Sequence, residues 1–223
     1  MNKIELNSLN AIIDGIFLQL RDNNISESEN LSRIQVEQWI HQYRALLIKQ
    51  DLDKGRDVNP AYVQTLGPLH ISKVSVCGVP NTFEYVSDKE LPKFIDLHFG
   101  SGLLAVRDMH GDLIQLGSET KARYQIARKY TCNDYIAFRK KNRLQLLGPG
   151  LLEYVQIDGI LEDPTKAGTC FDYDNTPYPV PANMIPTIKD MIFNKEIRNM
   201  LSVPTDNTNN SVNDVNNEIN RAV

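Results

Sequence analysis

The stretch between residues 43 and 68 constrains the fold most, because it predicts two helix ends in close succession. Lys54-Gly55 is a typical helix stop and ends a long helical pattern. Asn59-Pro60 then opens a short second helix, expected to reach about Leu66. Residues 69–76 follow, and they alternate between apolar and polar as a half-buried strand does. The stretch holds no nucleophile or cofactor motif, so it predicts a joint between a helical part and a β-rich part.

Two helices are expected before this joint and one near the end of the chain. Residues 7–22 carry an apolar stripe at helical spacing, with Ser8 as the N-cap. Ser32 and Gln35 predict a capping box at the start of the next helix. The last helix is expected over residues 182–201. The stripe of the second helix comprises Val36, Trp39, Ile40, Tyr43, Leu46 and Leu47.

The middle of the chain changes to strand patterns. Hairpins and single strands are expected over residues 69–76, 83–86, 93–99, 103–107 with 113–116, 135–139 with 144–147, and 151–161, with a short helix over 121–128. The predicted fold class is α+β: an N-terminal helical hairpin, a central antiparallel β-rich domain, a C-terminal helix and an extended polar tail. We expect a helical region in 1–68, a β-rich region in 69–164, a loop and C-terminal helix packing on the helical region in 165–201, and a tail in 202–223.

Charge and cysteine usage limit the partners and the compartment. The net charge of −4 argues against a freely diffusing nucleic-acid binder. Three cysteines without C-x-x-C spacing predict neither a disulfide framework nor a zinc site, and favour a reducing compartment. No stretch approaches the roughly 18 apolar residues of a membrane span, and the polar N-terminus lacks a signal-peptide core. We therefore expect a soluble protein made in a cytoplasm, without a membrane partner.

One string imitates a catalytic motif. Asp172 and Asp174 are similar to the nucleophile and the acid/base in the first motif of haloacid-dehalogenase-type phosphatases. Such a site needs the motif at the end of an early parallel strand, with magnesium-binding acids further along the sheet. Here Ala-Gly-Thr-Cys precedes the string and Pro-Tyr-Pro follows it, which favours a turn. We expect no enzyme activity and no cofactor, with the phosphatase kept as the alternative function. No metal site is expected either, because i,i+4 spacing is absent among His41, His70, His98 and His110.

Residues 119–143 form a basic segment in an acidic chain. Eight basic residues stand against two acidic ones, Glu119 and Asp134. A surface of this kind can meet an acidic partner, or can pass DNA by phosphate attraction without base readout. Solvated lysines on a turn are the alternative. The basic residues are Lys121, Arg123, Arg128, Lys129, Arg139, Lys140, Lys141 and Arg143.

The tail from Ser202 onward is polar and rich in asparagine, so disorder in isolation is expected. Its few apolar residues are spaced to share one face of a helix. We expect this face to dock on a neighbour and to order the tail only on assembly. It comprises Val212, Val215 and Ile219, followed by Ala222.

Three segments occur in the order seen in a known family. The first runs from Trp39 to Gly67 and includes the helix stop and Asn59-Pro60 described above. The second is Gly-Ile-Leu-Glu-Asp-Pro at 159–164, and the third begins Tyr-Pro-Val-Pro-Ala-Asn-Met-Ile at Tyr178 and extends to Ile192. Together they resemble the ring-shaped head-to-tail connector, or adaptor, proteins of short-tailed bacteriophages, in particular the crAss-like phages.

The resemblance implies a non-enzymatic structural protein of the virion. It implies a dodecameric homo-oligomeric ring that docks on the portal protein, contacts neighbouring tail ring proteins and continues the DNA channel. The resemblance places the ring at the portal vertex, after assembly in the host cytoplasm. A host-type binding module remains another alternative. We expect a role in joint geometry or intersubunit pairing, against the alternative of a solvated helix end, for Arg44, Gln50, Asp51, Lys54 and Arg56.

Overall fold

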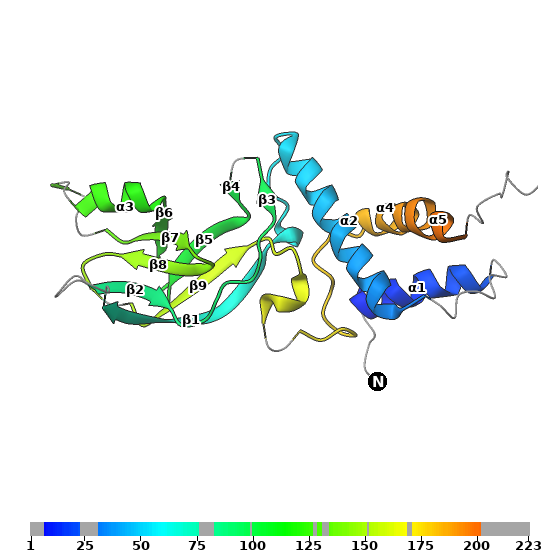
Figure 1. Ribbon diagram of the computed structural model, residues 1–223, viewed down its shortest axis with the longest axis horizontal. Coiled ribbons are helices and arrows are strands. Elements are labelled where there is room, and N and C mark those ends of the chain that lie inside the picture. The colour runs from blue at the N-terminus through cyan, green and yellow to red at the C-terminus, as the bar shows by residue number, and fades with distance from the viewer. Residues whose placement is uncertain are drawn as a thin grey trace, which may run out of the picture.

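In the computed structural model most of the helices gather at one end of the molecule, and the strands lie at the other end together with the helix of residues 119–126 (Figure 1). The longest helix, α2 (Arg33–Asp53), lies between the two ends. The α+β fold class is confirmed. The residues described are 7–22, 31–75, 83–98, 100–126, 129–130, 134–150, 152–168 and 171–201. The tail, with Val212, Val215 and Ile219, lies outside them, as do Arg128 and the cysteines Cys77, Cys132 and Cys170.

Three helical segments share the helical end with α2. The first is α1 (Leu9–Asp22) and the second is α4 (Met184–Met191). The third continues α4 and consists of the π-helix η4 (Ile192–Ile197) and the short α-helix α5 (Arg198–Leu201). The predicted cap of α1 is confirmed, because Ser8 Oγ accepts a hydrogen bond from the Ala11 N–H at 3.3 Å. Apolar faces of α1, α2 and α4 meet in one core. Its most buried members are Leu9, Ile12, Ile13, Ile16, Val36, Ile40, Ile188 and Ile192.

The two ends of α2 follow the sequence signals differently. Ser32 is the N-cap, but its side chain makes no cap hydrogen bond, so the predicted capping box is wrong. At the other end Lys54 is the C-cap and Gly55 has a φ of 75°, which confirms the predicted stop.

The short helix after the joint is a single 3₁₀ turn, η2 (Pro60–Tyr62), capped by a hydrogen bond from the Ala61 N–H to Asn59 Oδ1. The expectation that it reaches Leu66 is wrong, because Gln64 already pairs with Gly159 in the sheet. The backbone N–H and C=O groups that would have formed a longer helix instead pair with strand β9 (Tyr154–Gly159).

Seven strands close into a barrel in the order β1-β2-β8-β7-β6-β5-β9. Both predicted hairpins, β5–β6 and β7–β8, are confirmed as antiparallel pairs. One pair, β6–β7, is parallel, and α3 (Glu119–Ile126) forms the crossover that such a pair requires. The strands are β1 (Gln64–Ser75), β2 (Phe83–Ser87), β5 (Leu103–Asp108), β6 (Leu113–Leu116), β7 (Ile136–Lys140), β8 (Arg143–Leu147) and β9 (Tyr154–Gly159).

Two expected strands are shorter than predicted. Within the described part of this range, residues 93–98, only β3 (Asp96–Leu97) is a strand, paired with β4 (Gly100–Ser101). The Ile95 N–H instead donates to the Ile160 carbonyl, and the Ile95 carbonyl accepts from the Gly102 N–H, where the chain leaves the barrel. The expected strand over 151–161 is confined to β9, because a 3₁₀ helix, η3 (Pro164–Ala167), follows soon after it.

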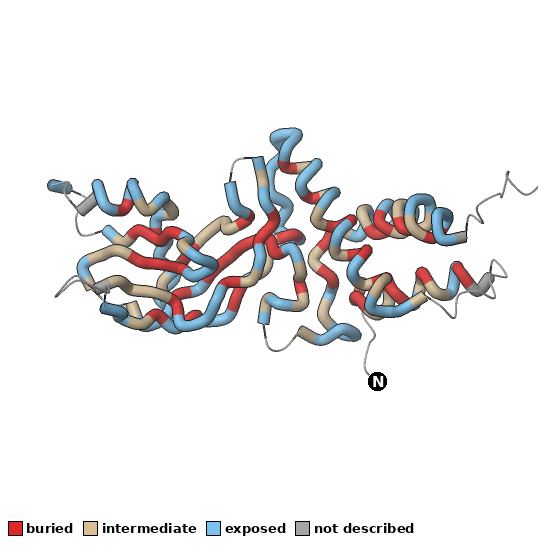
Figure 2. Tube along the Cα trace, viewed as in Figure 1, coloured by how far each residue is buried: buried red, intermediate tan, exposed pale blue. Residues whose placement is uncertain are grey.

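Buried residues lie in the helical end, in the barrel and in the region between them (Figure 2). The barrel is filled by a cluster that includes Ile71, Val106, Leu144 and Ile157. A separate cluster joins α2 to the barrel and contains Ile48, Leu52, Tyr62, Ile95 and Ile160. Among the described helices, none is long and apolar enough to cross a membrane.

Candidate functional site: the joint and the basic hairpin

Arg44 lies at the centre of the joint and is fully buried. It stands one turn after Ile40 on the inner face of α2, where the helix passes from the helical core to the barrel. Its Nη1 donates to the Leu161 carbonyl at 2.7 Å, and its Nε donates to the Pro179 carbonyl at 2.9 Å. One arginine on α2 therefore holds the segment after β9 and the segment before α4. A buried arginine is stable only when its donors are satisfied in this way.

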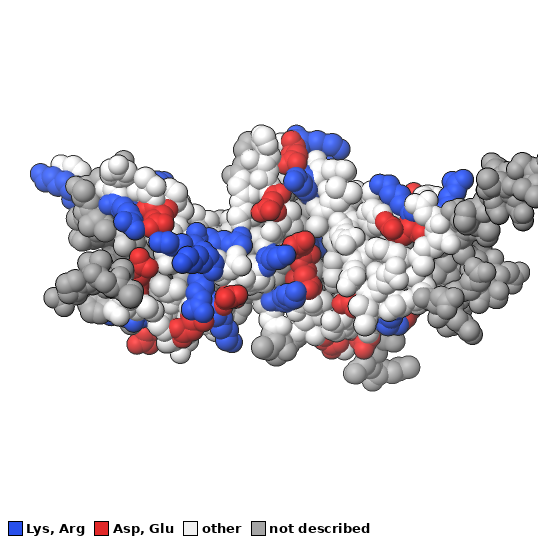
Figure 3. Space-filling model, in the orientation of Figure 1, with Lys and Arg blue, Asp and Glu red and all other residues white. Residues whose placement is uncertain are grey.

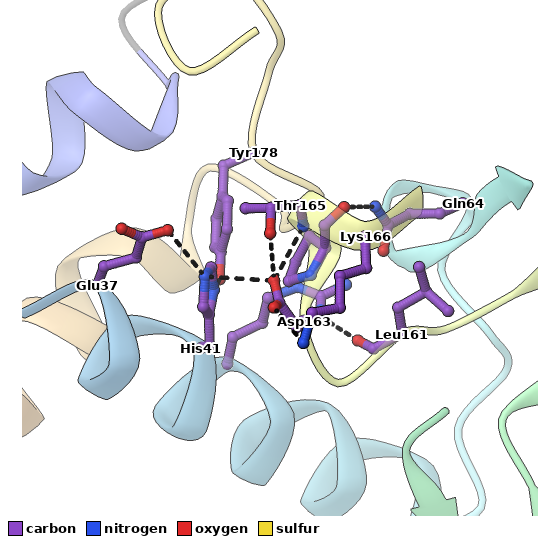
Figure 4. Close-up of polar contacts among 10 residues, drawn as sticks. Glu37, His41, Gln64, Leu161, Asp163, Thr165, Lys166 and Tyr178 are labelled. Atoms are coloured by element: carbon purple, nitrogen blue, oxygen red, sulfur yellow. Dashed lines mark hydrogen bonds and ion pairs between the residues drawn. The ribbon is translucent and has the colours of Figure 1, made fainter. Parts of the chain in front are cut away.

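His41 forms the second part of the joint, one turn before Arg44 on α2 (Figure 4). Its Nδ1 and Tyr178 Oη share a hydrogen bond of 2.8 Å, and the two rings stack with centroids 5.8 Å apart. Its Nε2 lies 3.6 Å from Glu37 Oε1 and 3.6 Å from Asp163 Oδ1, beyond direct hydrogen-bond distance. Burial lowers the pKa of His41 and outweighs the opposing attraction of Asp163 and Glu37.

Asp163 anchors the chain where it leaves the barrel. Its Oδ1 accepts hydrogen bonds from the Thr165 N–H and Oγ1, and its Oδ2 lies 3.2 Å from Lys166 Nζ. Burial opposes ionisation of this carboxyl, but the hydrogen bonds from Thr165 and Lys166 lower its pKa. Gln64 Nε2 donates to the Pro164 carbonyl at 3.0 Å, which ties this turn to the start of β1 (Figure 4). The turn after β9 therefore contacts both α2 and β1.

Hydrogen bonds also fix the polar turn after α2. Asp51 pairs with Arg56 at 2.7 Å and accepts a hydrogen bond from Tyr62 Oη at 3.0 Å. Burial and this hydrogen bond raise the pKa of Tyr62 to about 12. The remaining two of the five predicted joint residues, Gln50 and Lys54, are exposed. The structure thus brings Asp51 and Arg56 together, with Arg44 buried some distance along the same helix.

The basic segment divides into two parts. Lys121 and Arg123 lie on α3, and Lys129 lies beyond it with its Nζ 5.6 Å from the Tyr130 ring centroid. The second part is the β7–β8 hairpin, over which lysine and arginine side chains gather (Figure 3). The basic hairpin, as we call this part, contains Arg139, Lys140, Lys141 and Arg143.

The two parts meet at Glu119, which opens α3. Its carboxylate pairs with Arg123 at 2.7 Å and with Lys140 at 2.8 Å, and these hydrogen bonds lower its pKa. At the hairpin tip Lys141 and Asn142 have φ values of 48° and 60°, which the right-handed twist of a two-residue hairpin requires. Lys141 is therefore fixed at the apex of the turn and exposed.

The Asp172–Asp174 string forms a turn. The Asp172 carboxylate accepts hydrogen bonds from the Asp174 N–H at 2.9 Å and from Asn175 Nδ2 at 2.7 Å. Asp174 Oδ1 accepts from Asn10 Nδ2 at 2.7 Å, which attaches the turn to α1. Among the described residues, no strand ends at this string and no three His, Cys, Asp or Glu side chains are grouped to hold a metal. The phosphatase geometry is therefore not present in this part of the chain.

Sequence reasoning did not find the contacts of His41, Asp163 and Tyr178. The available signal was the position of Arg44, four residues after Ile40 and therefore on the apolar face of α2. A charged residue on a buried face needs partners. The partners themselves come from residues 161–179, far along the chain, and helical spacing carries no information about them.

The family comparison covers nearly the whole chain. A family model described as phage tail ring protein 2, of the crAss-like phage ring proteins, matches residues 11–215. The match includes both the joint and the basic hairpin. No curated protein matches the chain.

Proposed function

The chain belongs to the phage tail ring protein 2 family, and from that premise we propose that its copies close into a dodecameric ring joining phage head to tail. Membership makes it a structural protein of a bacteriophage virion, with the tail as its location. The proposal adds that the ring docks on the portal protein at one face, meets neighbouring tail ring proteins and continues the DNA channel. Assembly takes place in the host cytoplasm.

The buried joint is the observation that carries this proposal. A closed ring needs the same rotation between every pair of neighbours, so each subunit has to hold a fixed shape. In an elongated subunit, that shape is set by the angle between the helical end and the barrel end. Arg44, whose guanidinium donates to the carbonyls of Leu161, Pro179 and Tyr62, holds this angle from a fully buried position. Gln50 and Lys54, which are exposed further along α2, are then placed to contact a neighbouring subunit or the portal.

Charge supports a second element of the proposal. The basic residues of α3 and of the basic hairpin are proposed to contact passing DNA or an acidic protein partner. Phosphate attraction of this kind carries no sequence readout, as a DNA channel requires. The tail is proposed to dock on a neighbour through Val212, Val215 and Ile219.

Assembly with partner proteins tests the proposal. The purified chain is mixed with portal and neighbouring tail proteins, and the products are examined by native mass spectrometry and electron microscopy. We expect closed rings attached to the portal. Failure to enter any particle contradicts the proposal, whereas a monomer in isolation does not, because adaptor rings can form only on their partner.

A pair of variants tests the role of the joint surface in the same assay. Lys54→Glu is expected to weaken ring formation, since Lys54 stands at the exposed end of α2. Lys49→Glu makes the same charge change on an exposed position of the same helix and serves as the control. Equal effects of the two variants would remove the specific role of Lys54.

A further inference from the structure

A groove runs between α1 and the start of α2 in the helical end of the molecule. It has a volume of about 440 Å³ and is lined by Asp14, Phe17, Leu18, Leu31 and Arg33. Phe17 and Leu31 pack against the helical core and are partly buried, while Leu18 is 59% exposed. Among the described residues, therefore, the apolar side chains of this groove stay partly uncovered.

Leu18 lies on the outer side of α1. The buried side of this helix contains Ile12, Ile13 and Ile16. Leu18 comes two positions after Ile16 and is therefore turned about 200° around the helix axis from it. Scattered single apolar residues are ordinary on a protein surface, but one that borders an apolar groove extends the surface on which a partner can bind.

The charged residues of the groove already have partners. Arg33 Nη1 donates to Asp14 Oδ1 at 2.8 Å, and Arg33 Nη2 donates to Asn10 Oδ1 at 2.8 Å. An ion or a polar ligand would have to displace these bonds, whereas an apolar side chain only has to cover the three apolar residues. The chemistry of the groove therefore fits an apolar ligand.

The described part of the chain stops at the same end of the molecule as the groove. Leu201 closes α5, and α1 and α5 both extend to that end (Figure 1). The tail, residues 202–223, follows. Its apolar residues stand at positions i, i+3 and i+7, which is the anchor spacing of an amphipathic helix that binds in a groove. These anchors are Val212, Val215 and Ile219.

We propose that the tail of one copy docks as a helix in the groove of the next copy, with its three anchors against Phe17 and Leu18. The proposal rests on the ring proposed above and names the surface that receives the tail. Rotational symmetry places the helical ends of all copies at one level, so each tail starts level with the groove of its neighbour. Each copy then gives one tail and receives one, and the contact repeats around the ring.

The length and composition of the tail agree with this contact. The ten residues before the first anchor span at most about 35 Å when extended, against about 21 Å for the whole of α1. The anchors are therefore not confined to their own helical end. The rest of the tail is too polar to build a core by itself, so we expect the helix to form only on docking.

Disulfide trapping tests the contact. In the full chain the three natural cysteines are replaced by serine, and Leu18→Cys is combined with Val215→Cys. Rings are assembled with the portal and neighbouring tail proteins and are then oxidised. We expect disulfides between successive copies, seen as a ladder of multimers in non-reducing gel electrophoresis. Val74→Cys with Val215→Cys is the matched control and should give no ladder, because Val74 is an apolar residue of the barrel that is 48% exposed.

Aspartate substitutions give a second measurement with the natural cysteines in place. Leu18→Asp and Val215→Asp should each reduce the fraction of chains found in rings at least about tenfold, because the contact would bury an unpaired carboxylate. Val74→Asp makes the same change on the barrel and should leave that fraction unchanged. Leu18 is exposed in the single chain, so Leu18→Asp should leave the chain folded, which its melting temperature checks.

Disulfides that form within single copies overturn docking between copies, and so does a ladder no stronger than that of the Val74 control. Wild-type levels of rings in both aspartate variants overturn it as well. In each of these cases the wild-type chain still forms rings, so the proposed function stands. A wild-type chain that never forms rings with its partner proteins overturns the proposed function instead.

Discussion

The guanidinium of Arg44 lies 5.7 Å from the centroid of the Tyr178 ring, and both side chains are buried. Tyr178 reaches this position from the segment before α4, and it also shares a hydrogen bond with His41, one turn earlier on α2. A cation over an aromatic face is favourable where water is excluded. The pair therefore joins the last helix of the chain to α2 at the point where α2 meets the barrel.

Replacing Arg44 is expected to destabilise the fold. Arg44→Met keeps much of the volume but leaves the Leu161 and Pro179 carbonyls without their donor. An orphaned buried acceptor costs about 1–3 kcal/mol, so the free energy of unfolding should fall by about 2–4 kcal/mol in urea titrations. Arg33→Ala is the control, because Arg33 forms an exposed ion pair with Asp14 and should cost no more than about 1 kcal/mol. Equal losses in the two variants would contradict the role given to Arg44.

His41 is expected to make the fold sensitive to mild acid. Burial holds its pKa below the ordinary 6.5, so the folded state favours the neutral ring. The contribution of His41 is complete above about pH 6.5 and is lost as the pH falls through its folded pKa. The free energy of unfolding should fall between pH 7 and pH 5, and His41→Gln should remove part of this fall. His110→Gln, at an exposed turn, is the control. Stability that rises toward pH 5 would mean that the charged ring pairs with Glu37 and Asp163.

Local patterns predicted most of the elements of this fold. The Lys54-Gly55 stop and both hairpins are reproduced, because turn residues and side-chain alternation act over a few positions. The closed barrel and its parallel β6–β7 pair were not predicted, since strand order depends on contacts between distant segments. The short helix that begins at Asn59-Pro60 ends earlier than predicted for the same reason, because Gln64 pairs with Gly159 of β9.

The candidate sites show the same limit. The sequence placed Arg44 at a joint, but its partners on residues 161 and 179 lie more than a hundred positions away. The basic segment was expected as one surface, whereas the structure divides it between α3 and the hairpin and pairs Lys140 of the hairpin with Glu119 of α3. A count of charged residues along a sequence does not show which cations already form ion pairs in the fold.

Two glycines are expected to be essential for the contact between barrel and joint. A Cβ on Gly102 would lie 2.9 Å from the Ile95 and Ile160 carbonyl oxygens, and these are backbone atoms that cannot rotate away. A Cβ on Gly159 would lie 2.5 Å from the Phe94 ring. Gly102→Ala should therefore lower the free energy of unfolding by about 1–3 kcal/mol, as overpacking does. Gly168→Ala is the control, since among the described residues no atom beyond the chain neighbours of Gly168 lies within 4 Å of its Cβ position. Thermal unfolding of the two variants measures the difference, and similar melting temperatures would contradict the prediction.

Asp172 is expected to act in a turn and not as a nucleophile. Its oxygens already accept hydrogen bonds from Asp174 N–H and Asn175, and the Asn175 side-chain bond is the main cause of its lowered pKa. A lowered pKa means that the ionised group stabilises the turn above its ordinary pKa of 3.8, and that this contribution is lost as the pH falls below it. Asp172→Ala should reduce the melting temperature at pH 7, and the reduction should shrink in strong acid.

The same variant decides the remaining alternative function. Hydrolysis of a generic phosphoester with magnesium should be no greater for the wild type than for Asp172→Asn, because among the described residues no three His, Cys, Asp or Glu side chains are grouped to hold a metal ion, and Asp172 is engaged in its turn. Asp172→Asn keeps an oxygen that can accept the Asp174 N–H, so the turn persists while a nucleophile would be lost. Magnesium-dependent turnover by the wild type that disappears in this variant would establish the phosphatase, and would require Asp172 to leave its turn during the reaction.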